Sequence, residues 1–541
     1  MNYFKWYYSN TQGIRANIIT RIAAGFVQAV LDLYVVWLSK VFVDVVIPNG
    51  SNDDFFKTVL WLFLSTAAAV LIRQFYYYLT VKANTSQLIN IKNRIYQKLF
   101  TTPLFSSKTL HSGDITSRLS KDIELVSDVS SVILPQIVVV CVEFLGAFLL
   151  MRYFDARLAW FLAIVTPVIM AVGKLIAYRL RKLTRTIRDE DSRIQMQVQE
   201  SVEQNAVLRS LCAKKYMTET LVSRQDQLFA KTMRRTRFVI IIKGLTGLTF
   251  GLGFIAAFVY GGIQLKSGAI TFGTLTSFLQ LVGLIQSPIL TIMSYLPSVA
   301  QSTASIDRLD EIESSSEDNT ETLAPETSPI GIEFKDITFK YSDKGETIIK
   351  KFSHNFAPES KTAITGRTGI GKTTIFRLMM AFIKPEEGEI TLYNNSKIMP
   401  ITSAHRANFV FVPQGNTLIS GTIRFNLLIA DPTADDEKLK QVLHTASAEF
   451  VLDMKEGLDT ILGEHGSGLS EGQAQRIAIA RGLLRPGNIF LLDEISSALD
   501  PDTEKELYTR LFKAYPHKTM IFITHREAVE GWCNERVDLE N

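Results

Sequence analysis

The sequence predicts a chain of two parts: a helical membrane domain of six long spans, then a soluble α/β domain. Long apolar runs alternate with polar, basic stretches up to about residue 300. From residue 330 onward, short β-rich segments alternate with helical ones, as in α/β domains. A glycine-rich phosphate-binding motif lies in this second part. A length of 541 residues also favours at least two domains over one core.

Composition excludes several classes of protein. Hydrophobic residues make up 47% of the chain and charged residues 21%, which excludes intrinsic disorder and is unusually apolar for a soluble enzyme. A net charge of +4 is too small to indicate nucleic-acid binding. The three cysteines are far apart and form no CxxC pair, so we expect neither a disulfide framework nor a zinc site.

Six apolar runs are long enough to cross a bilayer, which takes about 20 helical residues. They lie near residues 19–47, 57–81, 130–151, 157–178, 238–262 and 272–297. The first run is followed by further spans and has no small-residue cleavage site, so we interpret it as a span and not as a removable signal peptide.

The loops between the spans predict the orientation. Pro48–Phe56 contains no Lys or Arg, whereas Lys82–Lys121 contains seven and Lys174–Arg237 contains fifteen. Basic loops stay in the cytoplasm, so we expect a multi-pass protein of the plasma (inner) membrane with its N-terminus and soluble domain cytoplasmic. The two basic stretches have helical patterns and are predicted to continue the membrane helices into water.

Several ionisable residues lie inside the predicted spans, where charges are costly and are functional candidates. The first span carries Asp32, Lys40 and Asp44 on about one third of its circumference, the second carries Arg73, and the third carries Glu143. Asp32 and Arg73 are 20 and 21 residues from the turn near residue 52, so we predict an ion pair at one depth. Whether these charges contact a substrate or lock two helices stays open.

A linker is predicted at residues 311–329, between a membrane domain at 1–310 and a soluble domain at 330–541. The linker contains the run SSSEDNTETLAPETSP, which is acidic, rich in Ser and Thr, and interrupted by two prolines.

The strongest motif is GRTGIGKTT, at Gly366–Thr374, between a strand-like segment and a helical one. Its backbone N–H groups are predicted to bind a phosphate chain, with Lys372 adding a positive charge and the Thr373 hydroxyl ligating Mg²⁺. Alone, the motif could still be a chance glycine-rich turn. The predicted nucleotide contacts here are Gly366, Arg367, Thr368, Gly369, Ile370, Gly371, Lys372, Thr373 and Thr374.

Two carboxylates follow a second apolar strand. Asn488–Leu492 leads directly into Asp493 and Glu494. An aspartate at the tip of a buried strand can hold magnesium, and the next glutamate can activate the attacking water. Asp-Glu after a strand is also a common turn, but its pairing with the glycine-rich loop favours a hydrolytic site.

A third motif, LSEGQ, occupies Leu469–Gln473. Ser470 and Gln473 fit a capping box for a helix over 471–484. Together with Gly472, this helix start can bind phosphate, although taken alone an ordinary helix cap is the simpler interpretation.

In this combination the residues resemble the ATP-binding cassette (ABC) transporters, specifically the six-span exporters with a fused nucleotide-binding domain. The resemblance covers nearly the whole chain. It implies an exporter-type helical membrane domain joined to an α/β P-loop NTPase domain of ABC type. Further matches in order are Tyr341 (adenine stacking), Gln414 (magnesium sensing), Thr460–Gly466 (the loop before the signature), Ser497–Asp500 (the D-loop) and His525 (the γ-phosphate).

The resemblance also implies activity and partners. Two chains, identical or not, would enclose ATP and Mg²⁺ between the Lys372 side of one chain and the Ser470 side of the other. Glu494, His525, Lys372 and Gln414 would be catalytic, and Thr373, Gln414 and Asp493 would hold the metal. We expect ATP-driven export of an amphipathic or lipid-like substrate by alternation between inward- and outward-facing states, with no nucleic acid as partner.

Alternatives and departures remain. An ATP-gated channel, a regulatory subunit, or the catalytic half of a heterodimeric exporter would share these motifs, although the presence of Glu494 favours a pump. Glu471 stands where the family has glycine, and the chain ends 16 residues after His525, earlier than in most relatives. Segments Phe105–Asp114 and Gln199–Leu211 resemble the family's coupling helices. The substrate cannot be read from the sequence.

Overall fold

The computed structural model describes residues 3–101, 112–314, 323–341, 345–463, 466–526, 529 and 531–539. The chain divides into two compact units. The first comprises Met1–Ile95 and Thr116–Asp310, and the second comprises Tyr96–Ile115 and Glu311–Asn541. Each unit is described by itself below.

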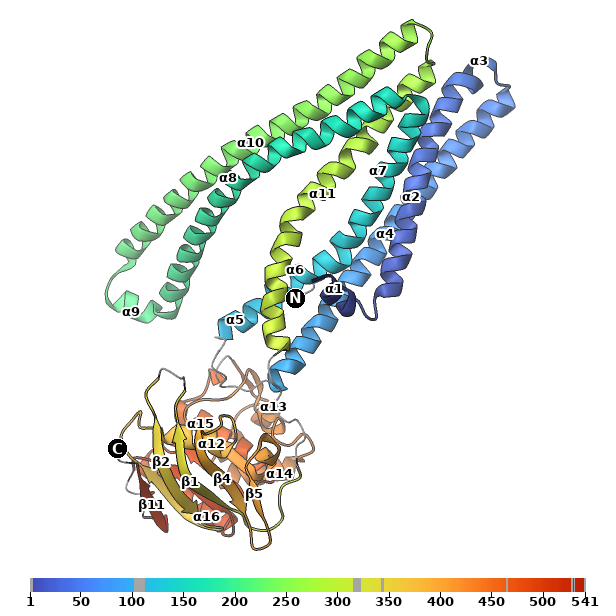
Figure 1. Ribbon diagram of the computed structural model, residues 1–541. Helices are drawn as coiled ribbons and strands as arrows, with labels where there is room; N and C mark the ends of the chain where they lie inside the picture. The colour runs from blue at the N-terminus through green and yellow to red at the C-terminus, as the bar shows by residue number, and fades with distance from the viewer. Residues whose placement is uncertain are drawn as a thin grey trace. The chain divides into compact units, whose positions relative to one another are not determined.

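The first unit is helical throughout its described residues (Figure 1). Three helices are very long: α4 has 50 residues, α8 has 48 and α10 has 53, which confirms that the basic stretches continue the predicted spans as helix. The α-helices up to residue 313, of which the end of α4, most of α5 and the end of α11 belong to the second unit, are α1 (Tyr3–Asn10), α2 (Arg15–Val41), α3 (Ile47–Asn49), α4 (Asn52–Thr101), α5 (Ser112–Ser117), α6 (Ile123–Asp128), α7 (Leu134–Phe154), α8 (Ala156–Glu203), α9 (Asn205–Ser210), α10 (Lys214–Lys266) and α11 (Phe272–Glu313).

Each of the six predicted spans lies on one of these helices, namely α2, α4, α7, α8, α10 and α11. By length and composition, four described helical runs could cross a membrane: Asn52–Thr101, Asp114–Phe154, Lys214–Lys266 and Phe272–Glu313. The side chains of 165–182, which include most of the fourth predicted span (157–178), lie outside the described residues. α11 continues to Glu313, so the first residues of the predicted linker are helical.

Three π-helical segments interrupt the helices: η1 (Phe42–Val46), η2 (Arg118–Asp122) and η3 (Val129–Ile133). Such segments insert an extra residue into an α-helix and often occur at functional sites. Hydropathy does not reveal them, because they keep the helical pattern of apolar residues.

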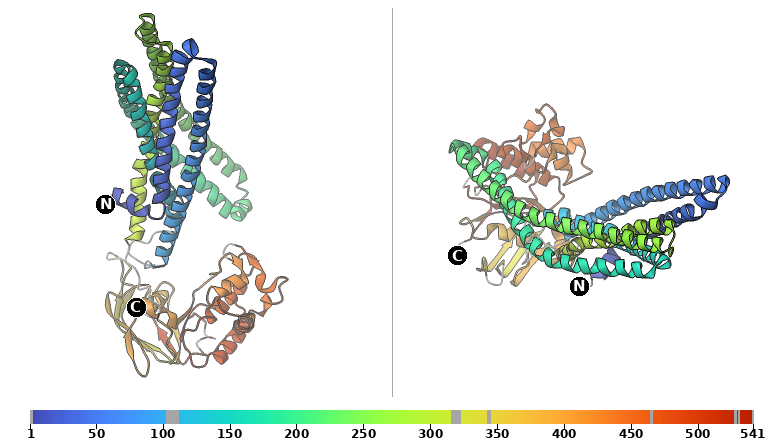
Figure 2. Two further views of the ribbon diagram at one scale, coloured as in Figure 1. Left: turned by 90° about the vertical axis from the view of Figure 1, so that its right-hand side faces the viewer. Right: turned by 90° about the horizontal axis from the view of Figure 1, so that it is seen from above.

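One buried apolar cluster of the first unit draws on α2, α7, α8, α10 and α11. Val36, Met151, Leu162 and Phe278 belong to this cluster. α8 and α10 contact each other along their length, and α9 forms the turn between them, as both views of Figure 2 also show.

The second unit contains a parallel sheet and an antiparallel sheet. The parallel sheet has the order β11-β3-β10-β9-β6, and the antiparallel sheet has the order β2-β1-β4-β5. The strands are β1 (Gly331–Phe339), β2 (Ile349–Phe356), β3 (Lys361–Thr365), β4 (Glu387–Tyr393), β5 (Ile398–Pro400), β6 (Phe409–Val412), β7 (Gly421–Thr422), β8 (Ile461–Leu462), β9 (Ile489–Asp493), β10 (Thr519–Ile523) and β11 (Glu535–Asp538).

The central parallel strands are buried, as their apolar sequences predict, whereas the edge strand β11 is largely exposed. All five residues of β9 and of β10 are buried. The helices of this unit are α12 (Lys372–Met379), α13 (Ile423–Leu428), α14 (Asp436–Thr445), α15 (Glu471–Leu483) and α16 (Pro501–Ala514). In parallel sheets, loops after the strand ends carry the binding residues.

Candidate functional site

The glycine-rich loop joins β3 to α12. Gly366, Gly369 and Gly371 have φ values of +137°, +86° and +112°, a region that favours glycine. At Gly371 a Cβ would lie 2.8 Å from Ile349 Cδ1, whereas at Gly369 no atom lies within 4 Å of that position. The loop is therefore packed at one end and open in the middle, which suits the approach of a phosphate chain to its N–H groups.

Asp493 stands at the tip of β9, against the start of α12. Its Oδ2 accepts a hydrogen bond of 3.2 Å from Thr373 Oγ1. Burial, aided by the charge of Glu494, raises the pKa of Asp493 to about 6, while Thr373 and Lys372 act the other way. Because so little positive charge compensates this buried carboxyl, the site suits a divalent cation, which Asp493 and Thr373 could both ligate.

Glu494 lies at the centre of a polar cluster. It has φ +47°, an unusual conformation for a residue other than glycine. Its Oε2 accepts a 2.6 Å hydrogen bond from Gln414 Nε2, and its Oε1 lies 3.7 Å from His525 Nε2. His525 Nε2 is also 2.5 Å from Lys372 Nζ. Lys372 and His525, 153 positions apart in the sequence, thus contact each other, and His525 in turn lies beside the Glu494 carboxylate.

The Lys372 ammonium also donates to the Gly366 carbonyl at 2.6 Å. Burial lowers the pKa of Lys372, although Glu494 and Asp493 oppose this shift. Positive charge is therefore held against the glycine-rich loop, where an anion would stabilise it.

Tyr341 lies beside the start of α12. Its hydroxyl is 3.1 Å from Thr374 Oγ1 and accepts a 2.7 Å hydrogen bond from Arg377. The side chain is 40% exposed, so a ring face is available for a planar ligand.

Ser470, Gly472 and Gln473 form a second cluster at the start of α15. The predicted capping box is confirmed: Ser470 N donates to Gln473 Oε1 at 3.0 Å, and Gln473 N donates to Ser470 Oγ at 3.2 Å. A Cβ on Gly472 would lie 2.7 Å from the Ala498 carbonyl, so α15 packs directly on the 497–500 loop. These cap residues bond to each other and not to Lys372.

Sequence reasoning missed Gln475 and Arg526. Gln475, buried in α15, donates to the Glu494 carbonyl at 2.9 Å. Arg526 donates to the carbonyls of Ser497 and Leu499 and to Glu504 Oε2, at 3.1, 3.3 and 2.7 Å. Gln475 stands among apolar residues of the predicted helix, and a buried side-chain amide needs a hydrogen-bond partner. This position in the sequence could have identified Gln475 as a residue with a buried polar contact.

In the first unit, the predicted pairing of Asp32 with Arg73 is confirmed at 3.9 Å between Oδ2 and Nη2. Glu143 interacts electrostatically with both residues. Of the predicted coupling segments, residues 105–111 lie outside the described residues, and 199–211 cover the end of α8 and all of α9. Residues 464 and 465 of the loop before LSEGQ are likewise not described.

Comparison with known families identifies both parts of the chain. The family model described as "ABC transporter transmembrane region" matches residues 18–289. The model described as "ABC transporter" matches residues 349–497. The second range contains the glycine-rich loop, LSEGQ, Asp493 and Glu494.

Similar proteins include exporters with differing cargo. A multidrug resistance ABC transporter ATP-binding and permease protein of Lactococcus lactis is 28% identical, covering 94% of this chain and 86% of its own. An ATP-dependent lipid A-core flippase of Desulfotalea psychrophila is 26% identical, covering 90% and 85%. The solved structure of a bacterial Atm1-family ABC exporter with ATP bound has a TM-score of 0.81 and 20% identity, covering 98% of this chain and 94% of that one.

Proposed function

Because this chain belongs to the ABC transporters, as a half-transporter with membrane and ATP-hydrolysing domains in one polypeptide, we propose that it exports an amphipathic or lipid-like substrate. The observation that carries the proposal is the cluster in which Gln414 and His525 flank Glu494 and Lys372 contacts His525, beside the Thr373–Asp493 pair. A subunit that only gates or regulates would not require an intact glutamate at this position.

The residues divide the chemistry among them. When bound, Mg²⁺-ATP supplies the phosphoanhydride bond that is cleaved. Lys372 would bind phosphate oxygens, and Thr373 and Asp493 would hold the magnesium. Glu494 would take a proton from the water as the water oxygen bonds to the γ-phosphorus and the bond to the ADP oxygen breaks, and His525 would face the γ-phosphate. Gln414 fixes the Glu494 carboxylate by its 2.6 Å hydrogen bond.

A second chain completes the nucleotide site in this proposal. Ser470, Gly472 and Gln473 form their own cluster, with the cap hydroxyl and helix N-terminus suited to a phosphate. They would contact ATP held by a partner's glycine-rich loop, while Tyr341 stacks on adenine. ATP drives closure because it binds the closed dimer more tightly than the open one.

The substrate class follows from the surface that the membrane helices offer. Aromatic side chains such as Tyr77, Tyr78 and Phe254 are exposed on the first unit, which suits apolar cargo. The charges of Asp32, Arg73 and Glu143 suit a polar head group. The basic content of 82–121 and 174–237 supports an inner-membrane location with the N-terminus and the ATPase domain on the cytoplasmic side.

Transport in proteoliposomes tests this function. The purified chain is reconstituted with a fluorescent short-chain phospholipid or a fluorescent hydrophobic dye, and its ATP-dependent movement between leaflets or compartments is measured. We expect movement with Mg²⁺-ATP that is abolished in Glu494→Gln and retained in Glu437→Gln, an exposed residue of α14. ATP hydrolysis without movement of either probe would contradict the proposed substrate class.

A further inference from the structure

The two ends of α11 are each held by a carboxylate that belongs to a π-helical segment. At its first turn, Asp44 of η1 accepts hydrogen bonds from Gly273 N at 2.7 Å and Thr271 Oγ1 at 2.5 Å. Near its last turns, Asp122 of η2 accepts from Ser305 Oγ at 2.8 Å and Arg308 Nη2 at 2.6 Å. We call these contacts the Asp44 clip and the Asp122 clamp.

The Asp122 clamp is the stronger of the two. Ser302 and Ser305 are fully buried, and Asp122 and Arg118 are each 5% exposed. Arg118 donates to the Arg308 carbonyl at 2.5 Å, and Tyr7 of α1 shares a 2.6 Å hydrogen bond with Ser302. Breaking such contacts would leave several buried polar groups without partners, which strongly opposes separation at this end.

The Asp44 clip depends on one carboxylate, whose side chain is 9% exposed, and the partners of this carboxylate lie closer to water. Thr271 is exposed, and Lys40, which pairs with Asp44 at 2.9 Å, has a side chain that is 25% exposed. Asp122 is buried to the same degree as Asp44, but the clamp also buries Arg118, Ser302 and Ser305. Fewer buried polar groups lose their partners when the clip opens, so its release costs less than release of the clamp.

The Asp44 clip also closes the space between α2 and α11. A Cβ on Gly273 would lie 2.6 Å from Asp44 Cγ and 2.7 Å from the Lys40 carbonyl, so the two helices approach through backbone here. Figure 1 shows α3 and the start of α11 at the same end of this unit. This is the end next to the loop at 48–56, which has no basic residue and is placed outside the cytoplasm.

We propose that the Asp44 clip is the latch of the outer gate: it holds α2 and α11 together in the closed state and releases to let substrate leave. The Asp122 clamp stays intact through the cycle, so α11 pivots about its inner end. This inference rests on the proposed export function and adds the location of its exit gate.

A matched pair of disulfides tests the latch. Asp44→Cys with Thr271→Cys cross-links the clip, and Asp122→Cys with Ser305→Cys cross-links the clamp, each with Cys141, Cys212 and Cys533 changed to serine. Each variant is oxidised in nanodiscs, and its Mg²⁺-ATP turnover is compared with that of its own reduced form. We expect the oxidised clip to lose at least fivefold in turnover, reversibly with dithiothreitol, and the oxidised clamp to stay within twofold.

The outcomes are distinguishable. Full ATP turnover by the oxidised clip variant would overturn the latch. Loss of turnover in both oxidised variants would contradict the proposal that only the Asp44 end of α11 is released. If the wild type and the reduced double-cysteine variants all fail both to bind and to hydrolyse ATP, the proposed function itself fails, and the latch falls with it.

A conformational measurement tests the latch without cross-linking. Spin labels on Ser51→Cys and Ser267→Cys, at the turns flanking the gate, report its opening by pulsed electron resonance. Vanadate trapping of the wild type gives the distances of the open gate. We expect Asp44→Asn and Gly273→Ala to populate these distances more than the wild type does when no nucleotide is bound. For Asp44→Asn the increase should be about tenfold, because a charged hydrogen-bond acceptor is lost. Asp53→Asn, an exposed acid at the same end, should leave the distribution unchanged. An unchanged distribution in Asp44→Asn would overturn the proposal.

Discussion

Gln475 and Glu494 are joined by a partly buried hydrogen bond of 2.9 Å, which the Gln475 side-chain amide donates to the Glu494 backbone carbonyl. Glu494 also donates its own N–H to the Ile523 carbonyl at 2.9 Å. The backbone of this carboxylate is therefore held on both sides, by α15 and by β10. Since its φ of +47° is unfavourable, the residue depends on these neighbours for its conformation.

Removing the Gln475 amide should impair hydrolysis more than nucleotide binding. We expect Gln475→Leu to lower the kcat for ATP by about tenfold with little change in KM, because a misplaced general base affects the chemical step. Steady-state ATPase assays in nanodiscs measure both constants. Gln441→Ala, an exposed glutamine of α14, is the control. A rise in KM alone would show that Gln475 supports binding and not Glu494.

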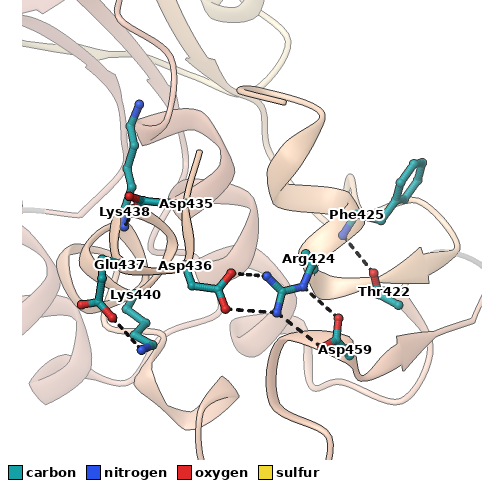
Figure 3. A network of polar contacts seen from close by, with 9 residues as sticks. All are labelled: Thr422, Arg424, Phe425, Asp435, Asp436, Glu437, Lys438, Lys440 and Asp459. Carbon is teal, nitrogen blue, oxygen red and sulfur yellow. Dashed lines mark hydrogen bonds and ion pairs between the residues drawn. The ribbon is translucent and has the colours of Figure 1, made fainter. Parts of the chain in front are cut away.

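Two arginine networks in the second unit should differ in their effect on stability. Arg526 pairs with Glu504, whose side chain is 7% exposed, whereas Arg424 joins Asp436 and Asp459, which are 56% and 62% exposed (Figure 3). We expect Arg526→Met to lower the free energy of unfolding by about 3 kcal/mol, because it leaves a buried carboxylate unpaired. For Arg424→Met we expect about 1 kcal/mol or less, since exposed pairs are screened by water.

Chemical denaturation followed by tryptophan fluorescence measures both changes. Glu504→Gln combined with Arg526→Met should recover part of the loss, because the buried charge is removed with its partner. Equal effects of the two single arginine substitutions would contradict the role of burial.

The Asp32–Arg73 pair should couple α2 to α4. At 3.9 Å, with the arginine side chain 59% exposed, we expect a coupling energy of about 1 kcal/mol in a double-mutant cycle of Asp32→Asn and Arg73→Gln. Thermal stability and transport of the three variants in nanodiscs and proteoliposomes provide the readouts. If the double variant and both single variants match the wild type in folding and transport, the pair has no role.

His354 should make the second unit less stable in acid. Burial lowers the pKa of this histidine, and Glu535, 3.5 Å away, opposes the shift only in part. The unfolded chain then binds the proton more readily, so the stabilisation is complete above the unfolded pKa of about 6.5 and is lost as pH falls below it. Thermal melts between pH 5 and 8 should show a smaller loss for His354→Gln than for the wild type. An identical pH dependence in the two proteins would contradict this assignment.

Much of the fold could be predicted from the sequence, because hydropathy and phosphate-site spacing are local signals. The spans fall on helices, the Gly366–Thr374 loop joins strand to helix, and the Ser470 cap has the predicted bonds. The pairing of Asp32 with Arg73 followed from helix rise alone.

Other features depend on contacts between distant segments. Asp44 looked like one more charge in a span, and nothing local links it to Gly273, 229 residues away. Gln475 and Arg526 act on backbone carbonyls, which carry no sequence signature. Some helices begin at other residues than the apolar pattern predicts. The pattern predicted a helix over 375–382, but α12 begins at Lys372, directly after Gly371, whose backbone is left-handed.

The most direct measurement of the central claim is ATP turnover by the wild-type chain in lipid nanodiscs, beside Glu494→Gln. We predict steady Mg²⁺-ATP hydrolysis by the wild type and a loss of about 10³-fold in Glu494→Gln, with ATP binding retained, because only the general base is removed. ATP binding without turnover in the wild type would indicate that a different partner chain is required. Turnover that is unchanged in Glu494→Gln would contradict the account, since hydrolysis would then not occur at the cluster of Lys372, Gln414, Glu494 and His525.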